Sequence, residues 1–532
     1  MEEKRYWYQR REAPDRTRRI TRRRLIQGTA LGSAGLAATA LIGCGRREQP
    51  RAQPETPAVP QPKRGGTLVR RNSLGNTIPF DAGLDPHPLQ ATYTSLMTQF
   101  YQTLLRLHPR TLAVEPEIAQ RWEQPSETVY LFRLHPGIRW HNKPPANGRA
   151  LTADDVVFSL NRVRTDDPRF QNRLLLSSIE RVEAVDKATV RVTTKRPDVS
   201  TLTNLAAFSV AILAPEVVEK AGKFSTPDTA VGTGAFMLQE LDDTHSLVVR
   251  NPDYWKPGLP YLDSVRNQYF GDDSAVWAAF LAKQIDVASN PVPGPEAKKL
   301  FEEQEGKPYF AEWYKDVSYT PAQPNTRRKP FDDIRVSRAI RLLLDHEEAS
   351  HQWAVTWFGR GYVCSYLPAA LEEWDFTEQE YVARFLEYKR PKDEAVREAL
   401  RLLAAAGFSR DNPLKFTLTG GTSPFSQAMS QLFQAQVNRF AQGVAQITDL
   451  RLLPLAQLNN VQAQGDFDYT LSNQVAPQPH DPDSWFTTFY YTNGGRNNGK
   501  MSDPRLDSMI DRQRDIFNLQ ERKAFVKEML AY

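Results

Sequence analysis

The stretch LTADDVVFSL, residues 151–160, decides the local fold of the region around it. Thr152 and Asp155 have the T-x-x-D spacing of a capping box, in which side chains bond the free backbone N–H groups at the start of a helix. We therefore expect a helix that begins at Thr152. Three stretches rich in β-branched and aromatic residues are expected to be strands, namely residues 128–140, 188–195 and 245–255. Interleaved strands and helices indicate a mixed α/β protein.

The net positive charge of the chain comes from its first 27 residues. The 532 residues include 68 Lys and Arg and 63 Asp and Glu. Residues 1–27 hold ten of the basic and four of the acidic residues, and residues 28–43 hold neither, so 58 basic and 59 acidic residues remain from Cys44 onward. Nucleic-acid binding depends mainly on phosphate neutralisation, and a nearly neutral body argues against that partner.

TRRRLIQGTALGSAGLAATALIGCGRR, residues 21–47, has the pattern of an export signal. Its uncharged core is shorter than the roughly 20 apolar residues that span a bilayer, and it consists mainly of small residues. Paired arginines before such a core suit the twin-arginine route. The stretch before Cys44 resembles a lipobox, so we predict a lipoprotein signal over residues 1–43 and a lipid on Cys44. A signal that is cut elsewhere or kept uncut is the alternative.

Residues 44–64 are expected to form a proline-rich tether. Five prolines lie between residues 45 and 64, with no apolar periodicity. The chain has two cysteines, Cys44 and Cys364, so acylation of the first leaves no pair for an intrachain disulfide. The folded body is then expected to rely on packing alone, which its size permits.

The sequence contains no recognisable catalytic or metal-binding motif. There is no G-x-S-x-G, H-E-x-x-H or G-x-G-x-x-G. Residues 494–501 satisfy G-x-x-x-x-G-K, but Met501 replaces the hydroxyl that a P-loop needs for Mg²⁺. The eight histidines are scattered, without the i,i+4 spacing of a helical metal site. We predict no enzyme activity, no cofactor and no metal. Adjacent carboxylates such as Asp154 and Asp155 are explained by helix capping.

Several short motifs occur in an order that resembles the family 5 extracellular solute-binding proteins, the dipeptide, oligopeptide and nickel binders of ABC importers. Six of them lie in the first half of the chain, at residues 65–69, 84–87, 114–119, 151–159, 231–236 and 250–255. Four more follow, at residues 330–336, 402–408, 465–468 and 481–483. Each motif is weak alone, and their order and spacing carry the resemblance.

The resemblance implies a periplasmic-binding-protein-like α/β clamp of class II with two lobes. Residues 65–318 would form a larger lobe with an extra subdomain, and residues 319–532 a second lobe. The implied function is capture of a peptide-like solute for an ABC permease and ATPase complex, by a monomer exported to the periplasm or the outer face of the cell membrane. A metal-chelate or oligosaccharide binder of the same fold is one alternative, and an exported hydrolase is another.

The resemblance also points to two ligand-contacting segments. One follows the LDPH turn, and the other precedes and includes the DPD motif. The residues expected to contact the ligand are Tyr93, Thr94, Asn473, Gln474, Gln478, Asp483 and Trp485. For Tyr93 and Trp485, core packing is the competing interpretation.

Two features depart from the family pattern. Peptide binders of the family place an acidic residue shortly before D-P-D, to pair with the α-ammonium of the ligand, but nothing acidic lies between Asp468 and Asp481. Gln478 falls near that position, so either the amino end is bound otherwise or the ligand is not a free peptide. The second departure is at Tyr532, where two amphipathic helices end. Family members continue and cross back to the first lobe, so we expect that return segment to be missing.

Overall fold

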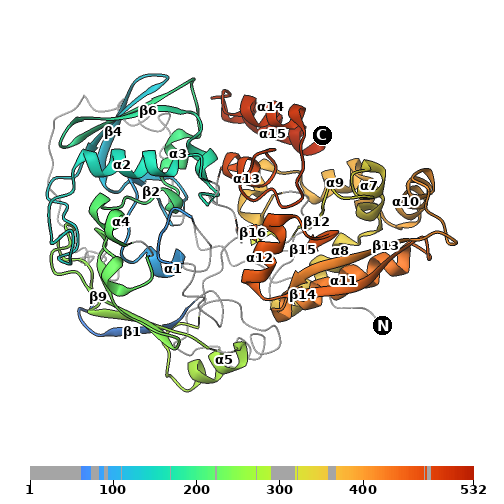
Figure 1. Cartoon of the computed structure of the whole chain (residues 1–532), viewed down its shortest axis with the longest axis horizontal. Coiled ribbons are helices and arrows are strands. Elements are labelled where there is room, and N and C mark those ends of the chain that lie inside the picture. Colours follow the sequence, from blue (N-terminus) through green and yellow to red (C-terminus); the bar gives the residue numbers. More distant parts are fainter. Residues whose placement is uncertain are drawn as a thin grey trace, which may run out of the picture. The chain divides into compact units, whose positions relative to one another are not determined.

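The computed structural model of the chain describes most of the sequence after residue 61 (Figure 1). The described residues are 62–72, 83–88, 94–109, 111–167, 169–221, 224–270, 272–288, 318–319, 321–357, 367–471, 474–475 and 481–532. The predicted signal, Cys44 and most of the predicted tether lie outside them. We call the described residues from 62 to 288 the larger lobe and those from 318 onward the second lobe.

The first sheet of the larger lobe pairs the first strand of the lobe with its last. Its four strands follow the order β1, β10, β9, β8. β1 runs parallel to β10, with Thr67 opposite Ser264, whereas β9 is antiparallel to both of its neighbours. The strands are β1 (Thr67–Arg71), β8 (Phe236–Leu241), β9 (His245–Arg250) and β10 (Ser264–Gln268).

The second sheet of the larger lobe is antiparallel, with the order β4, β5, β7, β6. Phe132, Val190 and Val192 on its two central strands are fully buried. One hydrophobic core joins this sheet to the first, because it also contains Val248 and Val265. The strands are β4 (Ala119–Ser126), β5 (Val129–Leu134), β6 (Ile179–Asp186) and β7 (Thr189–Thr194), and a separate hairpin consists of β2 (Leu105–Leu107) and β3 (Val114–Pro116).

Helix α2 (Ala153–Val163) begins where the capping box predicts. Thr152 is its N-cap, and the Thr152 backbone N–H donates to Asp155 Oδ2 at 2.9 Å. The same buried carboxylate accepts from Arg149 Nη2 at 2.7 Å, so it holds both the helix start and the preceding loop. The structural interpretation of Asp155 is confirmed.

The glycine-rich GTGAF motif of the larger lobe lies against the backbone of another segment. A Cβ added at Gly232 would lie 1.8 Å from the carbonyl oxygen of Phe100, so only glycine fits there. Short helices complete the lobe: α1 (Thr94–Met97), η4 (Arg173–Leu176), α3 (Thr201–Leu205), η5 (Phe208–Val210), α4 (Pro215–Ala221), η6 (Pro227–Thr229) and α5 (Asp273–Leu281).

The second lobe contains a four-stranded sheet with the order β12, β15, β13, β14. The central strand β13 runs parallel to β14 and to β15, and helix α11 connects β13 to β14 and packs on both (Figure 1). Antiparallel β12 closes one edge. The bounds are β12 (Ala322–Pro324), β13 (Leu414–Gly421), α11 (Pro424–Phe440), β14 (Ala445–Leu453) and β15 (Tyr469–Leu471).

Two hydrophobic cores lie in the second lobe. The first contains Ile340 on α7, Leu403 on α10 and Leu418 on β13. The other is formed largely by helices near the C-terminus and includes Trp485 and Val526. The helices are α7 (Ile334–Leu343), α8 (His346–Trp357), η7 (Ala369–Trp374), α9 (Glu378–Arg384), η8 (Leu386–Tyr388), α10 (Asp393–Ala405), α12 (Leu455–Gln464), α13 (Pro482–Phe489), α14 (Pro504–Gln513) and α15 (Leu519–Ala531).

The elements predicted from local sequence are present. β5, β7 and β9 fall within the three predicted strands, and α14 and α15 are the two predicted terminal helices. In the part of the chain that the structure describes, no helix combines the length and apolar composition needed to cross a bilayer. The lobe boundary at residues 318 and 319 and the extra subdomain stay predictions, since residues 289–317 are outside the described part.

Candidate functional site

The structure describes only some of the predicted ligand-contacting residues. Tyr93, Asn473 and Gln478 lie outside the described residues. Thr94 opens α1, and Gln474 lies in β16 (Gln474–Val475), where it pairs with Tyr319 of β11 (Ser318–Tyr319). For these two residues the structure places the backbone alone, so their role in binding stays a prediction.

Asp483 and Trp485 both lie on α13, and both are buried. Trp485 has no exposed surface, and its ring centroid lies 4.4 Å from that of Phe489 inside the terminal core. The structure therefore shows Trp485 in a packing environment, which was the competing interpretation for this residue. The Asp483 side chain is equally buried and is the centre of a polar network.

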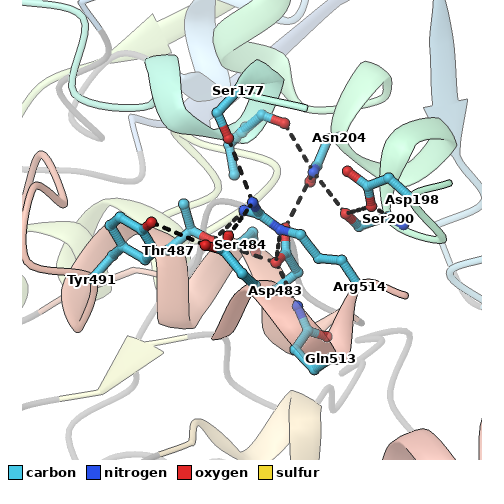
Figure 2. A network of polar contacts seen from close by, with 12 residues as sticks. Ser177, Asp198, Ser200, Asn204, Asp483, Ser484, Thr487, Tyr491, Gln513 and Arg514 are labelled. Atoms are coloured by element: carbon cyan, nitrogen blue, oxygen red, sulfur yellow. Dashed lines mark hydrogen bonds and ion pairs between the residues drawn. The ribbon is translucent and has the colours of Figure 1, made fainter. Parts of the chain in front are cut away.

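Asp483 is held by four side chains (Figure 2). Its Oδ1 accepts from Arg514 Nε at 2.6 Å and from Gln513 Nε2 at 2.6 Å. Its Oδ2 accepts from Arg514 Nη2 at 3.3 Å and from Asn204 Nδ2 at 3.3 Å. Thr487 Oγ1 donates to Oδ1 at 3.4 Å. Because donors from the protein surround both oxygens, the network explains why a charged residue is tolerated at this depth.

The charge of Asp483 is stabilised against the cost of burial. Burial by itself raises the pKa of the Asp483 carboxyl, but the charge and hydrogen bonds of Arg514 outweigh it, and the net pKa is lowered. For Asp198, which lies in the larger lobe, burial outweighs the stabilising contacts of the charged form. Burial, reinforced by the nearby charge of Asp483, raises the pKa of Asp198. The Oδ1 atom of Asp198 accepts from the backbone N–H and the hydroxyl of Ser200 at 2.8 and 2.6 Å.

A second buried ion pair lies beside the first. Arg522 donates through Nη2 to Asp481 Oδ1 at 2.8 Å and through Nη1 to Asp481 Oδ2 at 3.0 Å. Gln513 connects the two pairs, because its Oε1 accepts from Arg522 Nε at 2.8 Å while its Nε2 donates to Asp483. Both ion pairs are formed entirely within the second lobe.

The two lobes contact each other along what we call the lobe seam, between residues 171–204 and residues 481–515. Here Arg514 donates to Ser177 Oγ at 3.4 Å and its carbonyl accepts from the Val199 N–H at 3.1 Å. An ion pair also crosses the seam, between Arg196 Nη2 and Asp511 Oδ1 at 3.2 Å, and both of its side chains are more than a third exposed. In these contacts the larger lobe donates through the Val199 N–H and Asn204 Nδ2, and it accepts from Arg514 through Ser177.

No sequence pattern identified Arg514, Gln513, Arg522 or Asn204 as members of this network. The available signal was the acidic pair of the DPD motif, since buried carboxylates need cationic partners. That signal does not select the partners, which lie on other elements. Among the described residues, no group of three or more His, Cys, Asp or Glu side chains could hold a metal ion.

Two α/β lobes that meet along such a seam define a two-lobed binding clamp. Residues 113–497 match the sequence model of the bacterial extracellular solute-binding proteins, family 5 Middle. This match covers more than half of the chain, and the chain belongs to that family.

Known relatives extend over most of the chain. The periplasmic oligopeptide-binding protein OppA of Salmonella typhimurium is 25% identical over 473 residues, which are 84% of this chain and 80% of that protein. The di/tripeptide-binding protein 2 of Pseudomonas aeruginosa is 26% identical over 479 residues, 84% of each chain. The Haemophilus influenzae OppA structure in complex with RPPGFSPFR superposes with a TM-score of 0.75 at 21% identity, covering 88% of this chain and 91% of that one. The fold is thus that of the periplasmic binding proteins.

Proposed function

We propose that this protein captures a peptide-like solute between its two lobes and delivers it to an ABC permease and ATPase complex. The observation that carries the proposal is the family match over residues 113–497, which includes parts of both lobes. Two relatives with peptide-binding names, of which this chain covers 80% and 84%, support a peptide as the class of solute.

The chemistry of the lobe seam suits a clamp that closes and reopens. Both buried ion pairs, Asp483 with Arg514 and Asp481 with Arg522, stay within the second lobe when the lobes separate. Separation breaks the hydrogen bonds that Asn204 and the Val199 N–H donate and the one that Ser177 accepts from Arg514, and water replaces them at a net cost of about 1–3 kcal/mol each. A solute that contacts both lobes binds the closed state more tightly than the open state, and this difference in affinity shifts the population toward the closed state.

We further propose that the protein is exported by its twin-arginine signal, is anchored through a lipid on Cys44, and acts as a monomer without enzyme activity. The tether of residues 44–64 would keep the clamp near the permease while leaving it free to rotate. Export agrees with the relatives that are named periplasmic.

Native mass spectrometry of the full-length protein, followed by denaturation and sequencing of what it releases, tests the function. We expect a mixed population of short peptides, and calorimetric binding of synthetic di- to pentapeptides to protein stripped of its ligand. Release of a sugar or a metal chelate would refute the peptide assignment. Turnover of peptidase or esterase substrates would refute the assignment as a binding protein.

A further inference from the structure

The turn that follows α13 holds a cation at the edge of the lobe seam. The turn is fixed by Asn497, whose Nδ2 donates to the carbonyl oxygens of Tyr491 and Met501 at 3.3 and 2.6 Å. The Arg496 N–H donates to the Thr488 carbonyl at 3.0 Å, which ties the turn back to the helix. Arg496 is therefore presented by a rigid backbone.

This turn lies directly against the larger lobe. A Cβ added at Gly495 would lie 2.1 Å from the carbonyl oxygen of Gln171, so the two backbones touch there. Gln171 lies just before η4, and Ser177, which accepts from Arg514 in the seam, follows that helix directly. Arg496, the next residue, thus belongs to the second lobe but lies at its contact with the larger lobe.

The Arg496 guanidinium has no ion pair and no side-chain hydrogen bond to any residue that the structure describes. Its central carbon lies 5.1 Å from the centroid of the Phe489 ring, which is buried. The side chain is only half-buried, but burial lowers the pKa of Arg496 to about 10, with no described carboxylate to offset it. Arg514 and Arg522, by contrast, each pair with an aspartate.

The carboxylates nearby along the chain already have partners. Asp503 caps α14 by accepting from the Arg505 and Leu506 N–H groups at 2.9 and 3.1 Å. Asp507 accepts from the Thr492 N–H at 2.9 Å, and Asp511 accepts from the Tyr491 hydroxyl at 3.1 Å. Thr488, whose carbonyl accepts from the Arg496 N–H, has a buried Oγ1 with no partner among the described residues. Within the described part of the chain, a partly desolvated cation without a counter-ion and a hydroxyl without a partner therefore belong to two residues that share a backbone hydrogen bond.

We propose that Arg496 binds a carboxylate of the solute, with the Thr488 hydroxyl beside it as a further donor. The proposal rests on the proposed function, because it needs a solute enclosed between the lobes. A guanidinium suits a planar carboxylate, which accepts two parallel N–H bonds, and the Phe489 ring beneath it restricts its orientation. The carboxylate comes from the C-terminus of a peptide or from an acidic side chain.

The test compares the full-length protein with its Arg496→Gln and Arg496→Lys variants. Arg512→Gln is the matched control, because Arg512 also lies over a phenylalanine, 5.0 Å from the Phe525 centroid, but is exposed. Calorimetry measures the Kd for three probes: tri-alanine, tri-alanine amide, and Ala-Glu-Ala amide. The two amides distinguish a C-terminal from a side-chain carboxylate as the partner.

We expect Arg496→Gln to weaken binding of one carboxylate probe by about 10- to 100-fold, as for loss of a charge-assisted bidentate contact. Tri-alanine amide should bind all variants equally, and Arg496→Lys should recover part of the affinity. Thermal unfolding should be unchanged or raised in Arg496→Gln, because a cation without a counter-ion is removed.

Two results would overturn the assignment in different ways. If the wild type binds the probes and Arg496→Gln keeps the same preference for carboxylate over amide, Arg496 is not the anchor, while the proposed function stands. If the wild type binds no probe and releases no peptide, the proposed function itself fails, and the role of Arg496 fails with it.

Discussion

Replacement of Arg514 by methionine should destabilise the second lobe more than any change to an exposed arginine. Arg514→Met keeps an unbranched aliphatic stem, shorter than that of arginine, and removes the charge and the donors that reach Asp483, Thr487 and Ser177. The side chain of Arg514 is 4% exposed and that of Asp483 is fully buried. Water therefore cannot replace the lost partner without rearrangement, and an uncompensated carboxylate remains.

The expected loss follows from breaking one partner of a buried pair, which costs about 3–5 kcal/mol. Gln513 and Asn204 still donate to the carboxylate, so the value should lie toward the lower end of that range. Arg512→Met, two residues earlier in the last turn of α14, is the control, and it should cost less than about 1 kcal/mol because its side chain is exposed.

The assay is urea unfolding of the full-length protein at several pH values, monitored by tryptophan fluorescence. In the wild type the lowered pKa of Asp483 contributes stability at neutral pH, which is lost as the pH falls through that folded-state pKa. Without Arg514, burial instead raises the Asp483 pKa, so protonation in acid relieves the variant. The difference between variant and wild type should therefore shrink as the pH falls.

A loss for Arg514→Met that equals the Arg512→Met control would refute the view that this ion pair stabilises the lobe. So would a difference that stays constant with pH, because it would show that packing rather than the buried charge is responsible.

Three further changes have defined outcomes. Burial raises the pKa of Asp375 to about 6, so its charged form destabilises the fold above that pH. The Asp375→Asn side chain can still accept from Tyr381. In urea unfolding, this variant should be more stable than wild type by about 2–3 kcal/mol at pH 8 and equally stable near pH 4. Gly232→Ala should lower Tm by several degrees, since its Cβ would collide with the Phe100 carbonyl; an unchanged Tm in calorimetry would contradict that geometry. Cys44→Ser should lose palmitate labelling in cells, and a variant that still labels would disprove acylation at this cysteine.

Local signals in the sequence were sufficient for much of the fold. The capping box at Thr152 and Asp155 predicted the start of α2, because both partners lie within one helical turn. Strand composition likewise placed β5, β7 and β9. The pairing of β1 with β10 was not predictable in this way, since nothing near Thr67 specifies its partner Ser264.

The polar network at the lobe seam illustrates the same limit for the site. Asp483 was singled out from the sequence, but its partner Arg514 lies at the end of α14 and its partner Asn204 in the other lobe. The contact with Arg514 arises only when the second lobe folds, and the contact with Asn204 only when the two lobes come together. The sequence analysis proposed Asp483 as a ligand contact, and only the three-dimensional arrangement identifies the protein groups that surround it.

The bridge formed by Gln513 has a consequence for how this family member can diverge. One glutamine side chain accepts from Arg522 and donates to Asp483, so the two acids of the DPD motif and the two arginines share a single connecting group. A substitution at any one of these positions leaves a buried charge or an unpaired amide. Substitutions at these five positions should therefore be correlated, so that aligned relatives either keep all five residues or replace several of them together. The positions are 481, 483, 513, 514 and 522.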